Sequence, residues 1–172
     1  MTRDNRLGAA YAKAKTLVGV REIPGDEDNP VIVDMFKAVG HGWVKDDETA
    51  WCAAFVGAML EAQGLESTRK LNARSYLDWG QAVALEDAKP GDLVIFWRGD
   101  KNSWQGHVGF YVSHGNSFVN VLGGNQGDSV SVGQYKKSQL LGCRTLYTAG
   151  GGKAKSSGLL EKIVALFLKL LR

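Results

Sequence analysis

Cysteine and histidine are the residues of this sequence whose types and positions could form a nucleophile and its base. Cys52 stands near the start of an apolar run, residues 51–60, and polar residues at 46–49 precede this run. Because residues 46–49 are suited to cap a helix, we expect Cys52 in the first turn of a mostly buried helix. A helix N-terminus favours the thiolate, the reactive form of cysteine. Cys52 is therefore the candidate nucleophile; the alternative is a small buried hydrophobic residue.

The histidine best placed to act as the base is His107. It begins an apolar strand pattern directly after the polar segment 100–106, so its side chain can project from a sheet edge toward a helix packed there. The alternative is an ordinary, partly buried histidine. His41 and His114 lie in glycine-containing turns, where solvated side chains are expected. Cys143 lies in a predicted strand and is expected to be a core residue.

A third group must orient the imidazole of a cysteine–histidine pair. Asn125 lies at the end of segment 121–126, one hairpin beyond the candidate base, and its side-chain oxygen suits this role. Taken alone, Asn125 would be interpreted as a turn residue. Asn120 is a weaker candidate for the orienting group, and Gln126 is expected to face the substrate.

The elements that must position these residues change in type along the chain. Apolar spacing predicts helices in the first half, and short β-rich segments separated by Gly, Asn and Ser predict strands from Pro90 onward. This order indicates an α+β fold with an antiparallel sheet, rather than a doubly wound parallel one. The predicted helices cover residues 4–18, 30–39, 51–60 and 73–79, and the predicted strands cover 92–97, 107–112, 118–122, 130–132 and 141–146.

Composition and charge divide the chain into a body and a tail. With 172 residues and 44% hydrophobic residues, the sequence predicts one globular domain over 1–148 and excludes disorder and coiled coil. Residues 149–158 are rich in Gly, Ser and Lys and predict a flexible linker. Residues 149–172 contain five basic residues and one acidic residue, whereas the body is close to neutral. A nearly neutral body argues against nucleic acid as a partner.

The last segment, residues 159–172, predicts a cationic amphipathic helix. At about 1.5 Å per residue it would be too short to span a hydrocarbon core of about 30 Å, so we expect it to bind an anionic membrane surface. Docking onto the domain or pairing with a second copy is the alternative, although we expect a monomer. The residues expected at the membrane are Lys162, Phe167, Lys169 and Arg172.

No cofactor or metal is expected from the sequence. The acidic segment 26–29 lacks the 12-residue ligand spacing of a calcium loop, and three scattered histidines do not form a zinc motif. The first residues lack the apolar stretch of a signal peptide, so we expect synthesis in a reducing cytoplasm.

Several ordered motifs resemble a known group of enzymes. Cysteine at a helix start is followed by Pro-Gly-Asp-Leu-Val-Ile-Phe at 90–96 and Gly-His-Val-Gly-Phe-Tyr at 106–111. This order resembles the NlpC-like and CHAP-like cysteine amidases and peptidases of peptidoglycan. The strings at 47–56, 73–80 and 122–126 look like a phage- and prophage-associated branch of that group. The resemblance covers residues 5–147 and leaves the tail outside.

The resemblance implies a papain-like domain in which a nucleophile helix packs on an antiparallel sheet that carries the histidine. Carried over by position, Cys52 is the nucleophile, His107 is the general base and acid, and Asn125 is the orienting residue. Relatives vary at the orienting position, and the glutamine that CHAP-like enzymes place before the cysteine has no counterpart here. The Cys52 backbone N–H is the expected oxyanion donor.

Four side chains are expected to contact the substrate. Asp47 could orient it, Trp51 adjoins the nucleophile, Trp104 in the polar loop before the histidine could line a groove, and Gln126 could face it. For most tryptophans packing is the commoner role.

The resemblance implies a phage endolysin that cleaves an amide bond of the peptidoglycan peptide stem, as an N-acetylmuramoyl-L-alanine amidase or an endopeptidase. We expect such an enzyme to reach the cell wall from the host cytoplasm by holin-type release. The alternatives are a cysteine amidohydrolase toxin or effector with another substrate, and a catalytically silent module that binds wall or membrane.

Overall fold

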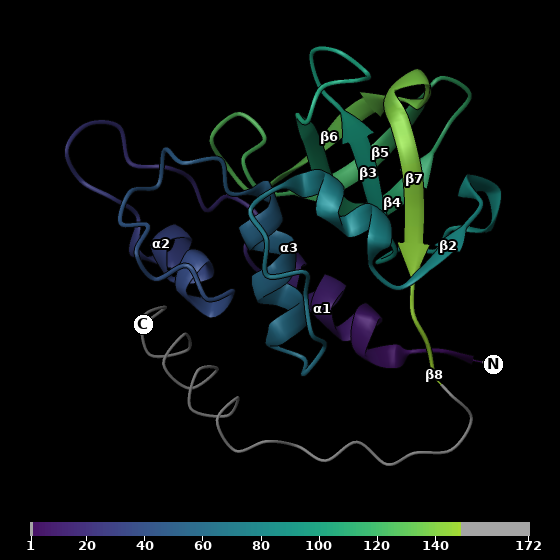
Figure 1. Ribbon diagram of the computed structural model, residues 1–172, viewed down its shortest axis with the longest axis horizontal. Helices are drawn as coiled ribbons and strands as arrows, with labels where there is room; N and C mark the ends of the chain where they lie inside the picture. The colour runs from purple at the N-terminus through teal and green to yellow at the C-terminus, as the bar shows by residue number, and fades with distance from the viewer. Residues whose placement is uncertain (1, 149–172) are drawn as a thin grey trace.

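The computed structural model describes residues 2–148, which form a group of helices packed against one sheet (Figure 1). The three α-helices are α1 (Asn5–Lys15), α2 (Pro30–Ala38) and α3 (Cys52–Glu61). Helix α3 contacts α1, α2 and the sheet strands β4 and β5, so it is the centre of the helical layer. The predicted α+β class is confirmed. The predicted linker at 149–158 and helix at 159–172 lie outside the described residues.

The main sheet has six antiparallel strands in the order β2-β7-β3-β4-β5-β6. A separate two-stranded pair, β1 with β8, joins the two ends of the described chain (Thr2 opposite Thr148). The strands are β1 (Thr2–Arg3), β2 (Gln81–Val83), β3 (Leu93–Trp97), β4 (Gly106–His114), β5 (Phe118–Gly123), β6 (Ser131–Lys136), β7 (Leu140–Thr145) and β8 (Tyr147–Thr148), and the 3-10 helices are η1 (Ala73–Asp78), η2 (Leu85–Asp87) and η3 (Lys137–Gln139).

Helix α3 is apolar on every side, which suits an element enclosed by other elements on all sides. Its residues Cys52–Leu60 are all buried. Gly57 permits the close approach, because a Cβ there would lie 2.6 Å from Val39 Cγ1 on the α2 side and 3.0 Å from the Tyr76 hydroxyl oxygen in η1. The core is therefore built around the helix that begins with the candidate nucleophile.

The N-terminus of α3 differs from the sequence expectation. Its N-cap residue is Trp51, and no side chain caps the helix. The polar residues expected to do so close a turn of their own, in which the Thr49 N–H donates to Asp46 Oδ1 (2.7 Å). The first backbone N–H groups of α3 are thus free of a side-chain cap, at the end of the helix that holds Cys52.

Within residues 2–148, no helix is long and apolar enough to cross a membrane.

Candidate active site

Cys52 lies in the first turn of α3, where the helix packs against β4. Its side chain is buried, and the backbone N–H of Val108, the residue after His107, lies beside the thiol. Burial raises the pKa of Cys52 above its usual value, while the N–H groups of Val108, Ala53 and Cys52 itself and the positive charge of Arg98 oppose that rise. The resting site therefore holds a neutral thiol.

His107 is fully buried on β4, opposite Phe96 on β3. Its Nε2 lies 3.0 Å from Oε1 of Gln126. The Gln126 amide nitrogen donates to the carbonyl oxygens of Ser131 (2.6 Å) and Val121 (3.3 Å), so its Oε1 must be the acceptor for the imidazole. His107 consequently carries its proton on Nε2 and presents an unprotonated Nδ1.

The Nδ1 atom of His107 is buried and has no hydrogen-bond partner among the described residues. Burial and, to a lesser extent, the charge of Arg98 lower the pKa of His107 to about 3, although the hydrogen bond to Gln126 opposes the shift. The imidazole is therefore neutral at physiological pH. A neutral thiol next to the Val108 N–H and a neutral imidazole with a free lone pair on the preceding residue are the groups that general-base activation of a cysteine requires.

Asn125 does not orient the imidazole, which corrects the sequence expectation. It adopts a left-handed backbone (φ 55°), and its side-chain nitrogen lies 3.4 Å from Glu22 Oε1. In the same turn the Gln126 N–H donates to the Ser129 carbonyl (2.9 Å), and the Gln126 side chain reaches His107. The amide that contacts the imidazole thus belongs to Gln126, one residue after the position expected from the sequence, because the turn reverses direction at Asn125.

Glycine provides the space for the Gln126 side chain. A Cβ on Gly123 would lie 2.8 Å from Gln126 Oε1 and 3.0 Å from His107 Nε2. Any larger residue at position 123 would push apart the two groups that form the hydrogen bond. Gln126, expected from the sequence to face the substrate, instead supports the imidazole.

Tyr135 on β6 is a further neighbour of the imidazole that sequence analysis missed. Its ring stacks on His107, with the ring centroids 4.7 Å apart and the planes 9° apart, and it also stacks on Phe96 at 4.8 Å. Burial raises the pKa of Tyr135 to about 12, so its hydroxyl stays neutral. In the sequence Tyr135 stands between two polar residues, Gln134 and Lys136, and this local alternation was the signal available for an inward-facing Tyr135.

Two of the expected substrate-binding residues have structural roles instead. Asp47 is 1% exposed, and its Oδ2 accepts hydrogen bonds from the backbone N–H groups of Ile23 (2.9 Å) and Asn29 (2.7 Å). Trp51 is fully buried, and its indole N–H donates to Glu22 Oε1 (2.7 Å). Neither side chain is accessible to a large substrate, because each anchors the chain that leads into α3.

Trp104 has the exposure expected of a substrate contact, since 74% of the residue is accessible in the loop between β3 and β4.

Cys143 is a buried free thiol in the cluster behind the sheet, as its strand position predicted. Within residues 2–148, no group of three or more His, Cys, Asp or Glu side chains is placed to hold a metal ion.

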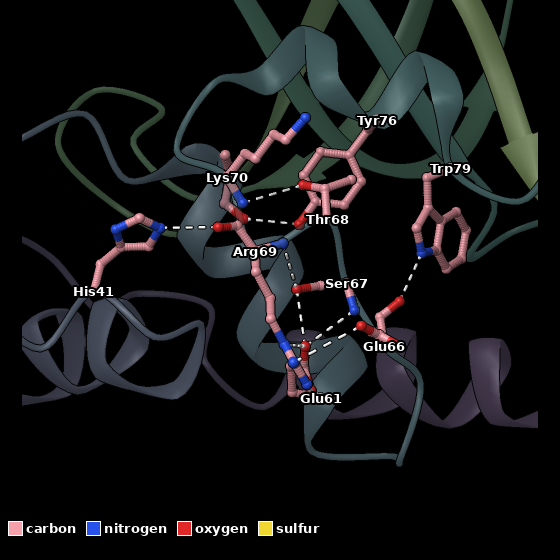
Figure 2. Close-up of polar contacts among 10 residues, drawn as sticks. His41, Glu61, Glu66, Ser67, Thr68, Arg69, Lys70, Tyr76 and Trp79 are labelled. Carbon is pink, nitrogen blue, oxygen red and sulfur yellow. Dashed lines mark hydrogen bonds and ion pairs between the residues drawn. The ribbon is translucent and has the colours of Figure 1, made fainter.

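A polar network beyond the far end of α3 fixes the helix from the opposite side (Figure 2). Glu61 accepts hydrogen bonds from Ser67 (3.0 Å) and Arg69 (2.9 Å), and the Tyr76 hydroxyl donates to the carbonyl of Ala53 (3.1 Å) in the first turn of the helix. The Glu61 contacts at the end of α3 and the Tyr76 contact in its first turn thus hold the helix at both ends.

The two remaining histidines are not the free turn residues that we expected. His41 Nε2 lies 2.9 Å from the Arg69 carbonyl oxygen, and its Nδ1 is buried (Figure 2). His114 Nδ1 lies 2.8 Å from the Tyr111 hydroxyl. His41 contacts a residue 28 positions away, and His114 lies within β4, where its partner is on the same strand; turn composition reveals neither contact.

Comparison with solved structures gives the same fold at low sequence identity. A lipoprotein-like NLP/P60 family protein of Staphylococcus aureus aligns with a TM-score of 0.54 and 17% identity, over 86% of this chain and 44% of that one. A variant of the resuscitation promoting factor interacting protein RipA aligns with a TM-score of 0.52 and 16% identity, over 83% and 62%. The P60 domain of a Mycobacterium avium subspecies paratuberculosis antigen aligns with a TM-score of 0.51 and 14% identity, over 83% and 94%.

The chain thus spans less than two thirds of the length of the first two of these proteins. A comparison with curated protein sequences finds no match. The model of the NlpC/P60 family matches residues 41–145, which include Cys52, His107 and Gln126 and make up more than half of the chain. The chain therefore belongs to the NlpC/P60 family.

Proposed function

We propose that this protein hydrolyses an amide bond of the peptidoglycan peptide stem, with Cys52 as nucleophile and His107 as general base and acid. The observation that carries the proposal is the His107 imidazole, whose tautomer is set by Gln126 and whose unpartnered Nδ1 lies in the same buried site as the thiol. Gln126 takes the orienting role that the sequence assigned to Asn125.

In the first half of the reaction, Sγ of Cys52 attacks the amide carbonyl carbon while Nδ1 of His107 accepts the thiol proton. The uncapped N–H groups at the start of α3, that of Cys52 first among them, stabilise the negative charge on the carbonyl oxygen. The C–N bond then breaks, and the imidazolium returns the proton to the departing amine. An acyl thioester on Cys52 remains.

In the second half, a water molecule takes the place of the amine. His107 accepts one water proton as the hydroxyl oxygen attacks the thioester, and it then returns that proton to the Cys52 sulfur. The products are a carboxylic acid and an amine, and the enzyme is regenerated.

The products formed when the protein digests purified Gram-negative peptidoglycan identify the bond that is cleaved. Mass spectrometry after digestion should show fragments with a new amine that are absent with Cys52→Ala. A free amine on L-alanine, with the peptide released from an intact sugar, would establish an N-acetylmuramoyl-L-alanine amidase. A new amine on a later residue of the peptide would establish an endopeptidase. If peptidoglycan stays intact while another amide substrate is cleaved, the proposal is wrong and the toxin or effector alternative holds.

We also propose that the protein works as a phage endolysin that reaches the periplasmic wall by holin-type release, as a monomer, with residues 159–172 acting on an anionic membrane. The support is the sequence pattern of that segment, with Lys162, Lys169 and Arg172 beside large apolar residues such as Phe167. Co-sedimentation with anionic and neutral vesicles tests it. The full chain should bind the anionic vesicles, whereas a chain that ends at residue 149 should bind neither.

A further inference from the structure

The loop between β3 and β4 is fixed at its base, beside the candidate active site. The Arg98 N–H donates to the Gln105 carbonyl (3.3 Å), which extends the pairing of the two strands beyond their ends. From η1, Arg74 donates to the carbonyls of Gln105 (2.9 Å) and Lys101 (3.0 Å). The position of Arg98 is therefore set by hydrogen bonds on both sides of the loop.

The strand register places Arg98 on the same face of the sheet as the imidazole. Phe96 pairs with His107, so their side chains share a face, and both stack on Tyr135. Side chains two residues apart in a strand point to the same side, so Arg98 follows Phe96 on this face. The guanidinium also acts electrostatically on all three groups of the site, because its positive charge lowers the pKa values of Cys52, His107 and Tyr135.

The guanidinium of Arg98 has no protein partner among the described residues. The ion pairs in residues 2–148 use Arg3, Arg6 and Arg69, and no hydrogen bond reaches the Arg98 side chain, which is exposed. By contrast, Arg74 and Arg144 donate to backbone carbonyls and hold the fold together. A fixed backbone thus presents a free planar donor group on the sheet face of His107, where its charge acts on the thiol, and a carboxylate is the group that such a fork binds best.

We propose that Arg98 binds a free carboxylate of the substrate next to the scissile amide, and so selects acidic peptide stems over their carboxamide forms. This inference rests on the proposed function, in that the substrate is a peptide of the cell wall. Arg98 is then a specificity-determining residue, whereas Gln126 and Tyr135 position the imidazole.

The kinetic test compares a wall-derived peptide that carries the free acid with the same peptide as carboxamide. For a charge-assisted hydrogen bond we expect wild type to favour the acid in kcat/KM by about 10- to 150-fold. Arg98→Gln should reduce this preference to about onefold, and Arg98→Lys, which keeps the charge but loses the fork, should be intermediate. The matched control Lys101→Gln removes a charge from the same loop and should keep the full preference. Equal rates for acid and amide in wild type, or an unchanged preference in Arg98→Gln, would overturn the proposal.

A second test needs no peptidoglycan and so separates this inference from the proposed function. Iodoacetate and iodoacetamide alkylate the same thiol, but only iodoacetate carries a carboxylate. If Arg98 holds the carboxylate of iodoacetate at about 4–6 Å, the ratio of the two rates at Cys52 should be about three- to sixfold higher in wild type than in Arg98→Gln. Peptide mapping distinguishes Cys52 from Cys143. If the ratio is the same in both proteins, Arg98 does not bind carboxylates at the thiol, whatever the natural substrate is.

Discussion

Replacing Gln126 with alanine should inactivate the enzyme far more than replacing Asn125 with alanine. Gln126→Ala removes the acceptor that lies 3.0 Å from His107 Nε2 and leaves that N–H unpaired in a buried site. The loss of such a partner costs about 1–3 kcal/mol, and if this cost falls on the correctly oriented imidazole, kcat/KM drops by about 5- to 150-fold. Asn125→Ala removes a 3.4 Å contact with Glu22 and places alanine at φ 55°, which lowers the stability by about 1 kcal/mol, but it leaves the acceptor of the imidazole in place, so the loss of kcat/KM in the folded protein should stay below about threefold.

Release of dye-labelled fragments from purified peptidoglycan measures both variants, and thermal denaturation shows whether each is folded. Gln126→Glu is an informative third variant, because a carboxylate would accept the same hydrogen bond but would lose those that the amide nitrogen donates to Val121 and Ser131. The reasoning is refuted if Asn125→Ala loses as much activity as Gln126→Ala, or if Gln126→Ala is folded and fully active.

Four further predictions test the site and its support. Because burial holds the pKa of His107 at about 3 instead of 6.5, kcat/KM should stay level from about pH 8 to pH 5; an acid limb near 6.5 would contradict a neutral buried base. Between pH 6.5 and pH 3, His107 binds a proton in the unfolded state but not in the folded state. The free energy of unfolding, measured by denaturant titration, should therefore fall as the pH drops from 6.5 toward 3. Tyr135→Ala should lower kcat by about tenfold, because it removes the ring that stacks on His107. Tyr135→Phe keeps the ring and should keep kcat. Equal losses of kcat in the two variants would assign the role to the hydroxyl instead. Gly57→Ala should destabilise the protein by about 1–3 kcal/mol, because the new Cβ would overlap neighbouring side chains. Gly8→Ala has open space around it and should stabilise the protein by about 0.5–1 kcal/mol. Equal melting temperatures of the two variants would refute the packing argument.

Local patterns in the sequence predicted the elements that carry the chemistry. The apolar run after residues 46–49 marked α3 and placed Cys52 in its first turn, and the change to a β-rich pattern marked β3, β4 and β5. The short strands β1, β2 and β8 escaped prediction, because two or three residues give no period and their pairing depends on segments far away in the chain.

The details of the site depend on contacts that one-dimensional patterns do not contain. Asn125 and Gln126 are adjacent amides in one turn, and only the backbone direction after φ 55° decides which of them reaches the imidazole. Asp47 is a polar residue close to the nucleophile in the sequence, as a substrate contact could be. It is nevertheless buried, because it accepts hydrogen bonds from two distant backbone N–H groups. The stack of Tyr135 on His107 arises from the pairing of β6 at the sheet edge.

The most direct test of the central claim is the loss of turbidity of outer-membrane-stripped Gram-negative cells. The samples are wild type, Cys52→Ala and a chain that ends at residue 149, each shown to be folded. We expect lysis by wild type and by the shortened chain, and no lysis by Cys52→Ala. Undiminished lysis by Cys52→Ala would contradict the assignment of the nucleophile and would leave the cationic C-terminal segment as the active part of the molecule.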